Sequence, residues 1–185
     1  MADIKHLSMA ELEAGLNFIR QSPRDQGDLE LIARRPRDDE RETLEAGRLD
    51  LQSGLEGDNW ITRGSKRTPD GTAHPDMQIT LMNSRVIALM AGDKERWPLA
   101  GDQLYVNLDL SAENLPAGTR LALGTAVIEV SAQPHTGCAK FVARFGVDAQ
   151  KFVNSPEGKQ LHLRGINARV IQSGTIQVGD LVRKI

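Results

Sequence analysis

The sequence has little cysteine, few aromatic side chains and almost no net charge. Its one cysteine, Cys138, excludes an intrachain disulfide bond and a structural zinc site built from several cysteines. Seven aromatic residues among 185 predict a core of mostly aliphatic side chains. The 23 basic and 25 acidic residues give a formal net charge of −2, which does not indicate nucleic acid as the main partner.

Long apolar segments are also missing. The longest apolar run, residues 86–91, is far shorter than the ~20 residues that a membrane-spanning helix needs. The first residues contain no apolar stretch like that of a signal peptide. We therefore expect no membrane partner and a cytoplasmic location. The four histidines show no metal-ligand spacing and no glycine-rich phosphate loop is present, so neither a histidine metal site nor a standard nucleotide cradle is expected.

Charge is unevenly distributed along the chain. Residues 1–133 carry 15 basic and 22 acidic side chains, whereas residues 134–185 carry 8 and 3. The basic excess in the second part is either solvated surface or a face toward an anionic small molecule such as a phosphorylated cofactor. A shorter basic run at residues 34–37 is followed at once by the acidic residues 38–40, which predicts that these charges neutralise one another locally.

The first part of the chain shows helical signals and one strand. Ser8 and Glu11 have the spacing of a capping box, and the apolar residues that follow predict a helix over residues 9–21. A short strand is expected at residues 29–33, and a helix at residues 39–46. Residues 53–76 are rich in glycine and proline and are expected to be irregular.

The rest of the chain is a series of short strands. Apolar alternation and β-rich runs predict strands at residues 78–81, 85–89, 104–110, 121–123, 126–130, 161–164, 168–172, 175–178 and 181–184. Glycine-rich turns separate many of these runs, and no regular alternation of strands with helices is present. This pattern favours a β-sandwich or a β-barrel.

The strand pattern is interrupted around the single cysteine. Pro134 ends one strand, and residues 139–145 have apolar side chains at helical spacing. With Thr136 as the N-cap, Cys138 would lie in the first helical turn, where free N–H groups favour an anion such as a thiolate. A lone cysteine is also often a small buried apolar residue, so this alternative remains open.

Residues 124–138 resemble the cysteine motif of the MOSC domain family, which is named for the C-terminal domain of molybdenum cofactor sulfurase. The stretch ends in Gln-Pro-His-Thr-Gly-Cys, similar to the family's Gln-Pro-Arg-x-x-Cys-like motif, but His135 replaces the usual arginine. Gly-Asp-Gln-Leu at residues 101–104 and the strands at 164–170 and 174–182 also have counterparts. We therefore expect an N-terminal helical segment at residues 1–23 and a MOSC-like domain at residues 24–185.

The resemblance implies a mainly β fold, a MOSC-type β-barrel with peripheral helices, and association with the molybdenum cofactor. Cys138 would be the catalytic residue, either as the molybdenum ligand or as a persulfide carrier. Other family members accompany a pyridoxal-phosphate desulfurase, but no pyridoxal phosphate site is identifiable in this chain. The candidate cofactor-binding residues are His135, Thr136, Lys140, Arg144, Arg164, Asn167 and Arg169.

Three functions remain open at this point. The first is a molybdenum-dependent enzyme that reduces N-hydroxylated compounds with electrons from a separate reductase. The second is a sulfur carrier or cofactor-delivery module that receives sulfur from a donor protein on Cys138. The third is a non-catalytic binding barrel with an inert cysteine.

Overall fold

Alternation of buried and partly exposed side chains defines the strands of the main sheet. In β8 (Ala126–Val130), Ala126, Ile128 and Val130 are buried, whereas the two residues between them are partly exposed. A period of two turns one face of a strand toward the core. The structure, a computed structural model, describes residues 5–185.

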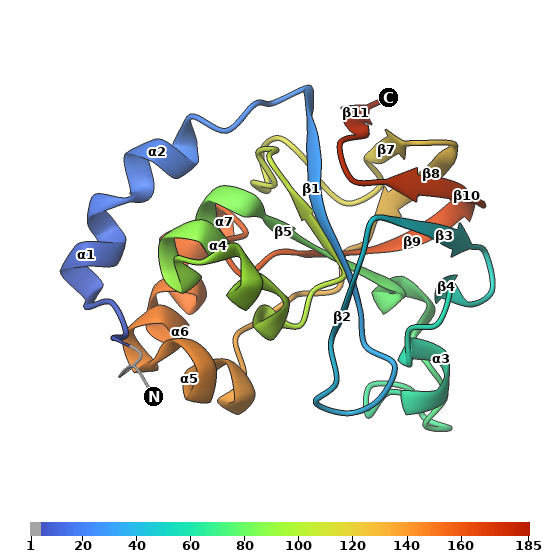
Figure 1. Ribbon diagram of the computed structural model, residues 1–185, viewed down its shortest axis with the longest axis horizontal. Helices are drawn as coiled ribbons and strands as arrows, with labels where there is room; N and C mark the ends of the chain where they lie inside the picture. Colours follow the sequence, from blue (N-terminus) through green and yellow to red (C-terminus); the bar gives the residue numbers. More distant parts are fainter. Residues whose placement is uncertain (1–4) are drawn as a thin grey trace.

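The main sheet closes into a barrel of seven strands with mixed directions (Figure 1). Gln26 on the first strand lies opposite Arg183 on the last one, and Asp28 lies opposite Leu181, which closes the barrel. The pairing of β5 with β6 is parallel. Around the barrel the order is β11 (Leu181–Lys184), β7 (Arg120–Leu123), β8, β9 (Ile166–Gln172), β5 (Ile79–Asn83), β6 (Leu104–Val106) and β1 (Gln26–Arg34).

Further short strands extend the architecture. β2 (Glu42–Leu44) pairs with the end of β1, so that residues 35–41 form the connecting hairpin loop. A separate three-stranded sheet consists of β10 (Gly174–Gln177), β3 (Ala46–Asp50) and β4 (Gly54–Leu55).

Helices gather mainly on one side of the barrel, with α3 on the opposite side (Figure 1). They are α1 (Met9–Ala14), α2 (Leu16–Arg20), α3 (Trp60–Arg63), α4 (Ser84–Ala91), α5 (Ala139–Phe145), α6 (Val147–Asn154) and α7 (Pro156–Gln160). Two 3₁₀ helices, η1 (Pro75–Met77) and η2 (Lys94–Ala100), complete the set. Within the described residues, no helix combines the length and apolar character needed to cross a bilayer.

Two clusters of buried side chains hold these layers together. The barrel interior is filled by aliphatic residues only, as the low aromatic content predicts. Most aromatic residues instead lie in the second cluster, between the barrel and the helices, where Phe141 and Phe145 of α5 pack with ring centroids 5.0 Å apart. Full burial of each such side chain contributes about 1.5–3 kcal/mol to folding. The second cluster therefore fixes α5, and with it the segment around Cys138, against the barrel.

Several predicted elements are confirmed. The capping box is present, because Ser8 Oγ accepts from the Glu11 N–H and the Glu11 carboxylate accepts from the Ser8 N–H. The helix that it starts is split at Gly15 into α1 and α2, where a Cβ would lie 2.5 Å from a Leu89 methyl group. The predicted strands at 29–33, 78–81, 121–123, 126–130, 168–172, 175–178 and 181–184 and the helix at 139–145 all have counterparts.

Three predicted elements are wrong. Residues 39–46 form no helix, because Leu44 pairs with Ile32 of β1. Residues 85–89 belong to helix α4 instead of a strand, because Asn83 Oδ1 accepts from the Arg85 N–H and caps the helix. Residues 161–164 form a turn, in which His162 has φ 48°.

One predicted strand ends earlier than expected, and one predicted domain boundary stays untested. The strand expected at residues 104–110 ends at Val106. The division of the chain between residues 23 and 24 stays a prediction, although β1 is itself a strand of the barrel.

Candidate functional site

The loop between β8 and α5 is held in place by two asparagine side chains. Nδ2 of Asn167, a buried residue of β9, donates to the carbonyl oxygens of Gln133 at 3.1 Å and Pro134 at 3.4 Å. Nearer to α5, the N–H of Gly137 donates to Oδ1 of Asn154 at 3.0 Å, and Nδ2 of Asn154 donates back to the Gly137 carbonyl at 3.2 Å. These hydrogen bonds fix the loop on both sides of its centre.

Cys138 follows this loop and is exposed. It is itself the N-cap of α5, and its carbonyl oxygen accepts from the N–H groups of Phe141 at 3.0 Å and Val142 at 3.1 Å. The expectation that Thr136 is the N-cap, with Cys138 inside the first turn, is therefore wrong by two residues. The thiol nevertheless stands at the start of the helix on a backbone that neighbouring hydrogen bonds hold.

A cavity of about 330 Å³ surrounds this position. We call it the cysteine pocket. It brings together most of the residues that the sequence singled out, namely Cys138, His135, Lys140, Arg144, Arg164 and Asn167. It also contains residues that sequence reasoning did not assign to a site, among them Arg35, Arg37, Asp38, Asp39, Arg41, Asn59 and Arg63.

A buried ion pair forms one wall of the cysteine pocket. Nη1 of Arg164 donates to Oδ2 of Asp102 at 2.6 Å, and Nη2 donates to the carbonyl oxygen of Ala100 at 2.8 Å. Burial raises the pKa of the Asp102 carboxyl group, and Arg164 opposes this effect. The other carboxylate oxygen, Oδ1, lies 3.4 Å from Nδ1 of His135.

His135 is uncharged at neutral pH. Burial lowers the pKa of its imidazole well below 6.5, and the positive charges of Arg164 and Arg35 lower it further. The ring therefore adds no positive charge where the family motif usually has an arginine.

A second buried ion pair lies on the β1–β2 loop. Nε and Nη2 of Arg35 donate to the two carboxylate oxygens of Asp58 at 2.9 and 2.8 Å, and Nη1 donates to the Gly101 carbonyl at 3.0 Å. Although burial opposes the change, the hydrogen bonds from Arg35 lower the pKa of Asp58. The prediction that acidic residues 38–40 neutralise the basic run is confirmed for Arg37, whose Nη1 lies 3.8 Å from Oε1 of Glu40, and is wrong for Arg35, whose partner is Asp58.

Two further arginines increase the positive charge of the pocket. Burial lowers the pKa of Arg41, as do the neighbouring charges of Arg144 and Arg35. Arg63 is exposed, but desolvation by the pocket wall and the charge of Arg35 likewise lower its pKa, and it has no ion-pair partner among residues 5–185. Desolvation is the largest cause of both shifts, and the neighbouring cations add to it.

An acidic residue of the hairpin loop contacts the basic residues of α5. Oδ1 of Asp39 accepts from Nζ of Lys140 and from Nη2 of Arg144, both at 3.0 Å. Hydrogen bonds from Lys140 lower the pKa of Asp39. The β1–β2 loop is thereby joined to the helix that starts at Cys138.

The composition of the cysteine pocket fits a phosphorylated ligand. Seven basic and two acidic side chains line it, and buried polar atoms at its wall have no hydrogen-bond partner within the described chain, including Oδ1 of Asn59, Oδ1 of Asn167 and Nε of Arg164. Buried polar groups are normally paired, so unpaired ones at a cavity indicate a missing partner. Residues 5–185 contain no cluster of three or more His, Cys, Asp or Glu side chains suited to a metal ion. The soft sulfur groups that line the pocket are the Cys138 thiol and the Met77 thioether, and only the thiol can ionise.

Two predicted cofactor-binding residues lie elsewhere. Thr136 lines a different cavity on the other side of the loop. Arg169 points away from the cysteine pocket on β9, where Nη2 donates to Glu129 at 2.7 Å and Nη1 lies 3.8 Å from Asp76. Asn167 and Arg169 are two residues apart on β9 and so share one face of the strand, but Arg169 lies further along it, opposite Glu129.

Comparisons with known proteins agree with this architecture. The family model of the MOSC domain matches residues 68–183. The crystal structure of the YuaD protein from Bacillus subtilis has a TM-score of 0.59 and 18% identity, and the match covers 85% of this chain and 94% of that one. YiiM from Escherichia coli has a TM-score of 0.54 and 20% identity, with 85% and 69% covered. These likenesses confirm the predicted fold, a mainly β MOSC-type barrel with peripheral helices. No curated protein sequence matches the chain.

Proposed function

Since the chain belongs to the MOSC domain family, we propose that it binds the molybdenum cofactor in the cysteine pocket and reduces N-hydroxylated compounds. Electrons would come from a separate reductase protein. The observation that carries this proposal is the presence of an exposed thiol, Cys138, in the same cavity as seven basic side chains. A thiolate is a soft ligand suited to a transition metal, and arginine is suited to a phosphate group.

The basic residues divide into two groups by their partners. Arg35 and Arg164 are held by buried carboxylates, so they form a fixed wall. The other five are not held by buried carboxylates and would bind the phosphate of the cofactor, namely Arg37, Arg41, Arg63, Lys140 and Arg144. The unpaired Oδ1 atoms of the two pocket asparagines supply acceptors for N–H groups of a heterocycle.

The reaction consumes two electrons and two protons, breaks the N–O bond of the substrate, and releases water. When bound, the cofactor supplies the metal centre on which the oxygen atom is removed. The chain would bind and orient the cofactor. Cys138 would hold the metal, and the hydrogen bonds from Asn154 and Asn167 keep the loop before the cysteine in place. The neutral His135 leaves the wall near Asp102 without a further positive charge.

Metal analysis tests this proposal directly. The protein is expressed in a host that makes the cofactor, and molybdenum per chain is measured for the wild type, Cys138→Ala, Arg63→Ala and the control Arg120→Ala, an exposed arginine outside the pocket. We expect near-stoichiometric molybdenum in the wild type and the control, a large loss in Cys138→Ala, and a smaller loss in Arg63→Ala. Absence of molybdenum from the wild type, with the cofactor supply verified, would contradict the proposal.

A sulfur-carrier function is the second candidate, and the exposure of Cys138 favours it. In that case the Cys138 thiolate attacks the sulfane sulfur of a donor protein's persulfide. The S–S bond of the donor breaks, a new one forms on Cys138, and the donor cysteine leaves as a thiolate. Detection of a persulfide on Cys138 by mass spectrometry in protein without molybdenum would support this function over the first.

A further inference from the structure

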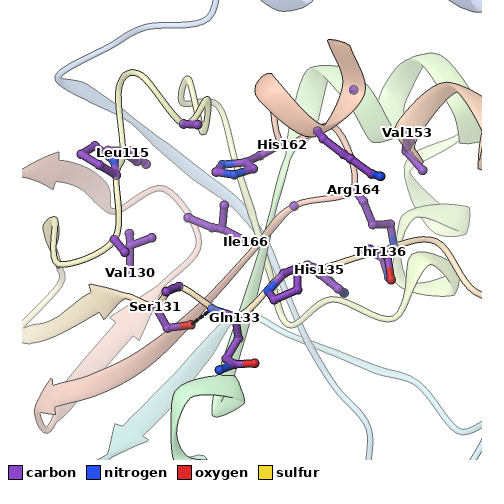
Figure 2. Close-up of a pocket in the computed structure, with 18 residues that line it drawn as sticks. Leu115, Val130, Ser131, Gln133, His135, Thr136, Val153, His162, Arg164 and Ile166 are labelled. Atoms are coloured by element: carbon purple, nitrogen blue, oxygen red, sulfur yellow. Dashed lines mark hydrogen bonds between the residues drawn. The ribbon is translucent and has the colours of Figure 1, made fainter. Parts of the chain in front are cut away.

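A second cavity of about 460 Å³ adjoins the cysteine pocket. We call it the apolar cavity. His135 and Arg164 line both cavities, so these two side chains form the boundary between them. Figure 2 shows His135 and His162 near the centre of this region, with Leu115 and Val130 to one side of them.

The lining of the apolar cavity is mainly hydrocarbon. Side chains of Leu115, Val130, Val153 and Ile166 contribute to it, together with alanines and prolines from two loops. Protein interiors are normally packed with few voids larger than a water molecule, whereas ligand pockets have volumes of roughly 300–1,000 Å³. The apolar cavity therefore has the size and the surface of a site for a small organic molecule.

Local backbone geometry keeps the apolar cavity open beside His135. Gly165 has φ +108°, and a Cβ there would lie 2.2 Å from the Leu81 carbonyl oxygen and 3.3 Å from Nδ1 of His135. In the turn just before it, Nδ1 of His162 lies 2.6 Å from the Leu110 carbonyl oxygen. A carbonyl oxygen only accepts, so Nδ1 carries the proton and the His162 ring is fixed in orientation at the cavity.

The charges of the apolar cavity select against cations. Its charged side chains are Lys159 and Arg164, and no aspartate or glutamate is among the described residues that line it. Lys159 is exposed, whereas Arg164 is buried and neutralised by Asp102. A bound molecule would thus meet hydrocarbon over most of its surface and positive charge at one edge.

We propose that the apolar cavity binds the body of the substrate: an N-hydroxylated compound with a mainly apolar, aromatic or branched body and no positive charge. This inference rests on the proposed function for the identity of the reacting group. The apolar body occupies the cavity, and the polar end reaches the boundary at His135, beyond which lies the cysteine pocket.

Binding of fluorescent probes tests the cavity independently of any metal. The probes are anilinonaphthalene sulfonate, which is anionic, dansylamide, which is uncharged, and dansylcadaverine, which is cationic. We expect saturable binding of the first two probes to one site per chain, and at least tenfold weaker binding of the third. Equal or tighter binding of dansylcadaverine would overturn the proposed selectivity.

Two pairs of matched variants locate the binding site. Ala117 is an exposed residue at the rim of the apolar cavity, so the indole of Ala117→Trp should weaken binding of both probes at least tenfold. The control Ala14→Trp, on the exposed face of α1, should leave their binding unchanged. Lys159→Glu should weaken binding of the anionic probe and strengthen binding of the cationic probe. Lys151→Glu, outside the cavity, should change the affinity of neither probe. Unchanged probe binding in both Ala117→Trp and Lys159→Glu would overturn the inference.

Failure of this inference is distinguishable from failure of the proposed function. If the wild type lacks molybdenum but binds the probes as described, the proposed reaction is wrong and the cavity remains a ligand site. If molybdenum is bound and N-hydroxylated compounds are reduced, Ala117→Trp should retain its molybdenum and raise the KM at least tenfold for benzohydroxamic acid. An unchanged KM in that variant would place the substrate elsewhere.

Discussion

Nη1 of Arg164 donates a 2.6 Å hydrogen bond to Oδ2 of Asp102, a carboxylate with no solvent-exposed surface. The two residues lie far apart in the sequence and meet at the boundary between the cysteine pocket and the apolar cavity. Their interaction fixes the guanidinium group of Arg164, which lines both cavities.

Removal of one partner should therefore be costly. We expect Asp102→Ala to lower the free energy of unfolding by about 3–5 kcal/mol, because it leaves Arg164 as an unpaired buried charge. The measurement is equilibrium urea denaturation. As a control, Glu113→Ala removes an exposed partner of Arg24 and should cost less than about 1 kcal/mol. Similar losses in the two variants would show that the Asp102 pair is not structurally important.

The stability of the fold should fall on mild acidification because of His135. The pKa of this residue is lowered in the folded state by burial and by nearby arginines, whereas a histidine in the unfolded chain has a pKa of about 6.5. Below about pH 6.5 the unfolded chain thus binds a proton that the folded chain rejects, and stability falls by up to about 1.4 kcal/mol per pH unit. Well above pH 6.5 the histidine is uncharged in both states, so the contribution of His135 to the free energy of unfolding no longer changes with pH.

Denaturation at pH 7.5 and pH 5.5 measures this effect. His135→Gln lacks the titrating group, so its loss of stability between the two pH values should be smaller than that of the wild type by about 1 kcal/mol or more. Equal losses in the two proteins would mean that His135 takes up its proton in the folded state as readily as in the unfolded one.

Neutralising Asp39 should increase the affinity of the cysteine pocket for anions. Asp39 accepts hydrogen bonds from Lys140 and Arg144, and Asp39→Asn frees their charges for a ligand. We expect pyrophosphate to bind roughly three- to fivefold more tightly, since a unit charge at about 4 Å contributes about 1 kcal/mol in water. Calorimetric titration gives the affinity. The control Glu56→Gln, at an exposed ion pair with Arg48, should leave it unchanged, and a weaker affinity in Asp39→Asn would refute the assignment.

Gly165 should tolerate no side chain. Gly165→Ala adds a Cβ only 2.2 Å from the Leu81 carbonyl oxygen at a residue with φ +108°. Gly118 has φ +91° but no atom within 4 Å of such a Cβ, so Gly118→Ala isolates the cost of the backbone conformation, about 1–2 kcal/mol. We expect Gly165→Ala to lose at least twice as much stability as Gly118→Ala. Equal losses in thermal denaturation would exclude a steric contribution.

The sequence predicts the barrel strands better than the segments between them. Strands such as β8 alternate clearly between buried and exposed residues, and this local signal survives folding. Residues 85–89 are rich in β-branched and aliphatic side chains, which suit a buried helix as well as a strand. The hydrogen bond from the Arg85 N–H to Asn83 Oδ1 caps the helix and decides for it over a strand. The periodicity of apolar residues carries no information about this cap. Residues 39–46 contain good helix formers, but their pairing with β1 overrides that preference.

The cysteine pocket could be predicted only in part for a related reason. Residues near Cys138 in sequence stand out through the interrupted strand pattern and the family motif. Arg35, Asp58 and Arg63 come from distant segments, and only the folded barrel brings them to the same cavity. One available signal was the position of Arg35 two residues after the strand predicted at residues 29–33, near the end of a barrel strand.

The closure of the barrel by β1 and β11 also determines when the sheet can be completed during synthesis. The edge of β1 that carries Gln26 emerges from the ribosome early and has no partner until residues 181–184 have been made. Until then, unpaired N–H and C=O groups on both strands are open to other chains. Docking of β11 between β1 and β7 therefore completes the scaffold that carries the hairpin loop with Arg35 and the helix with Cys138.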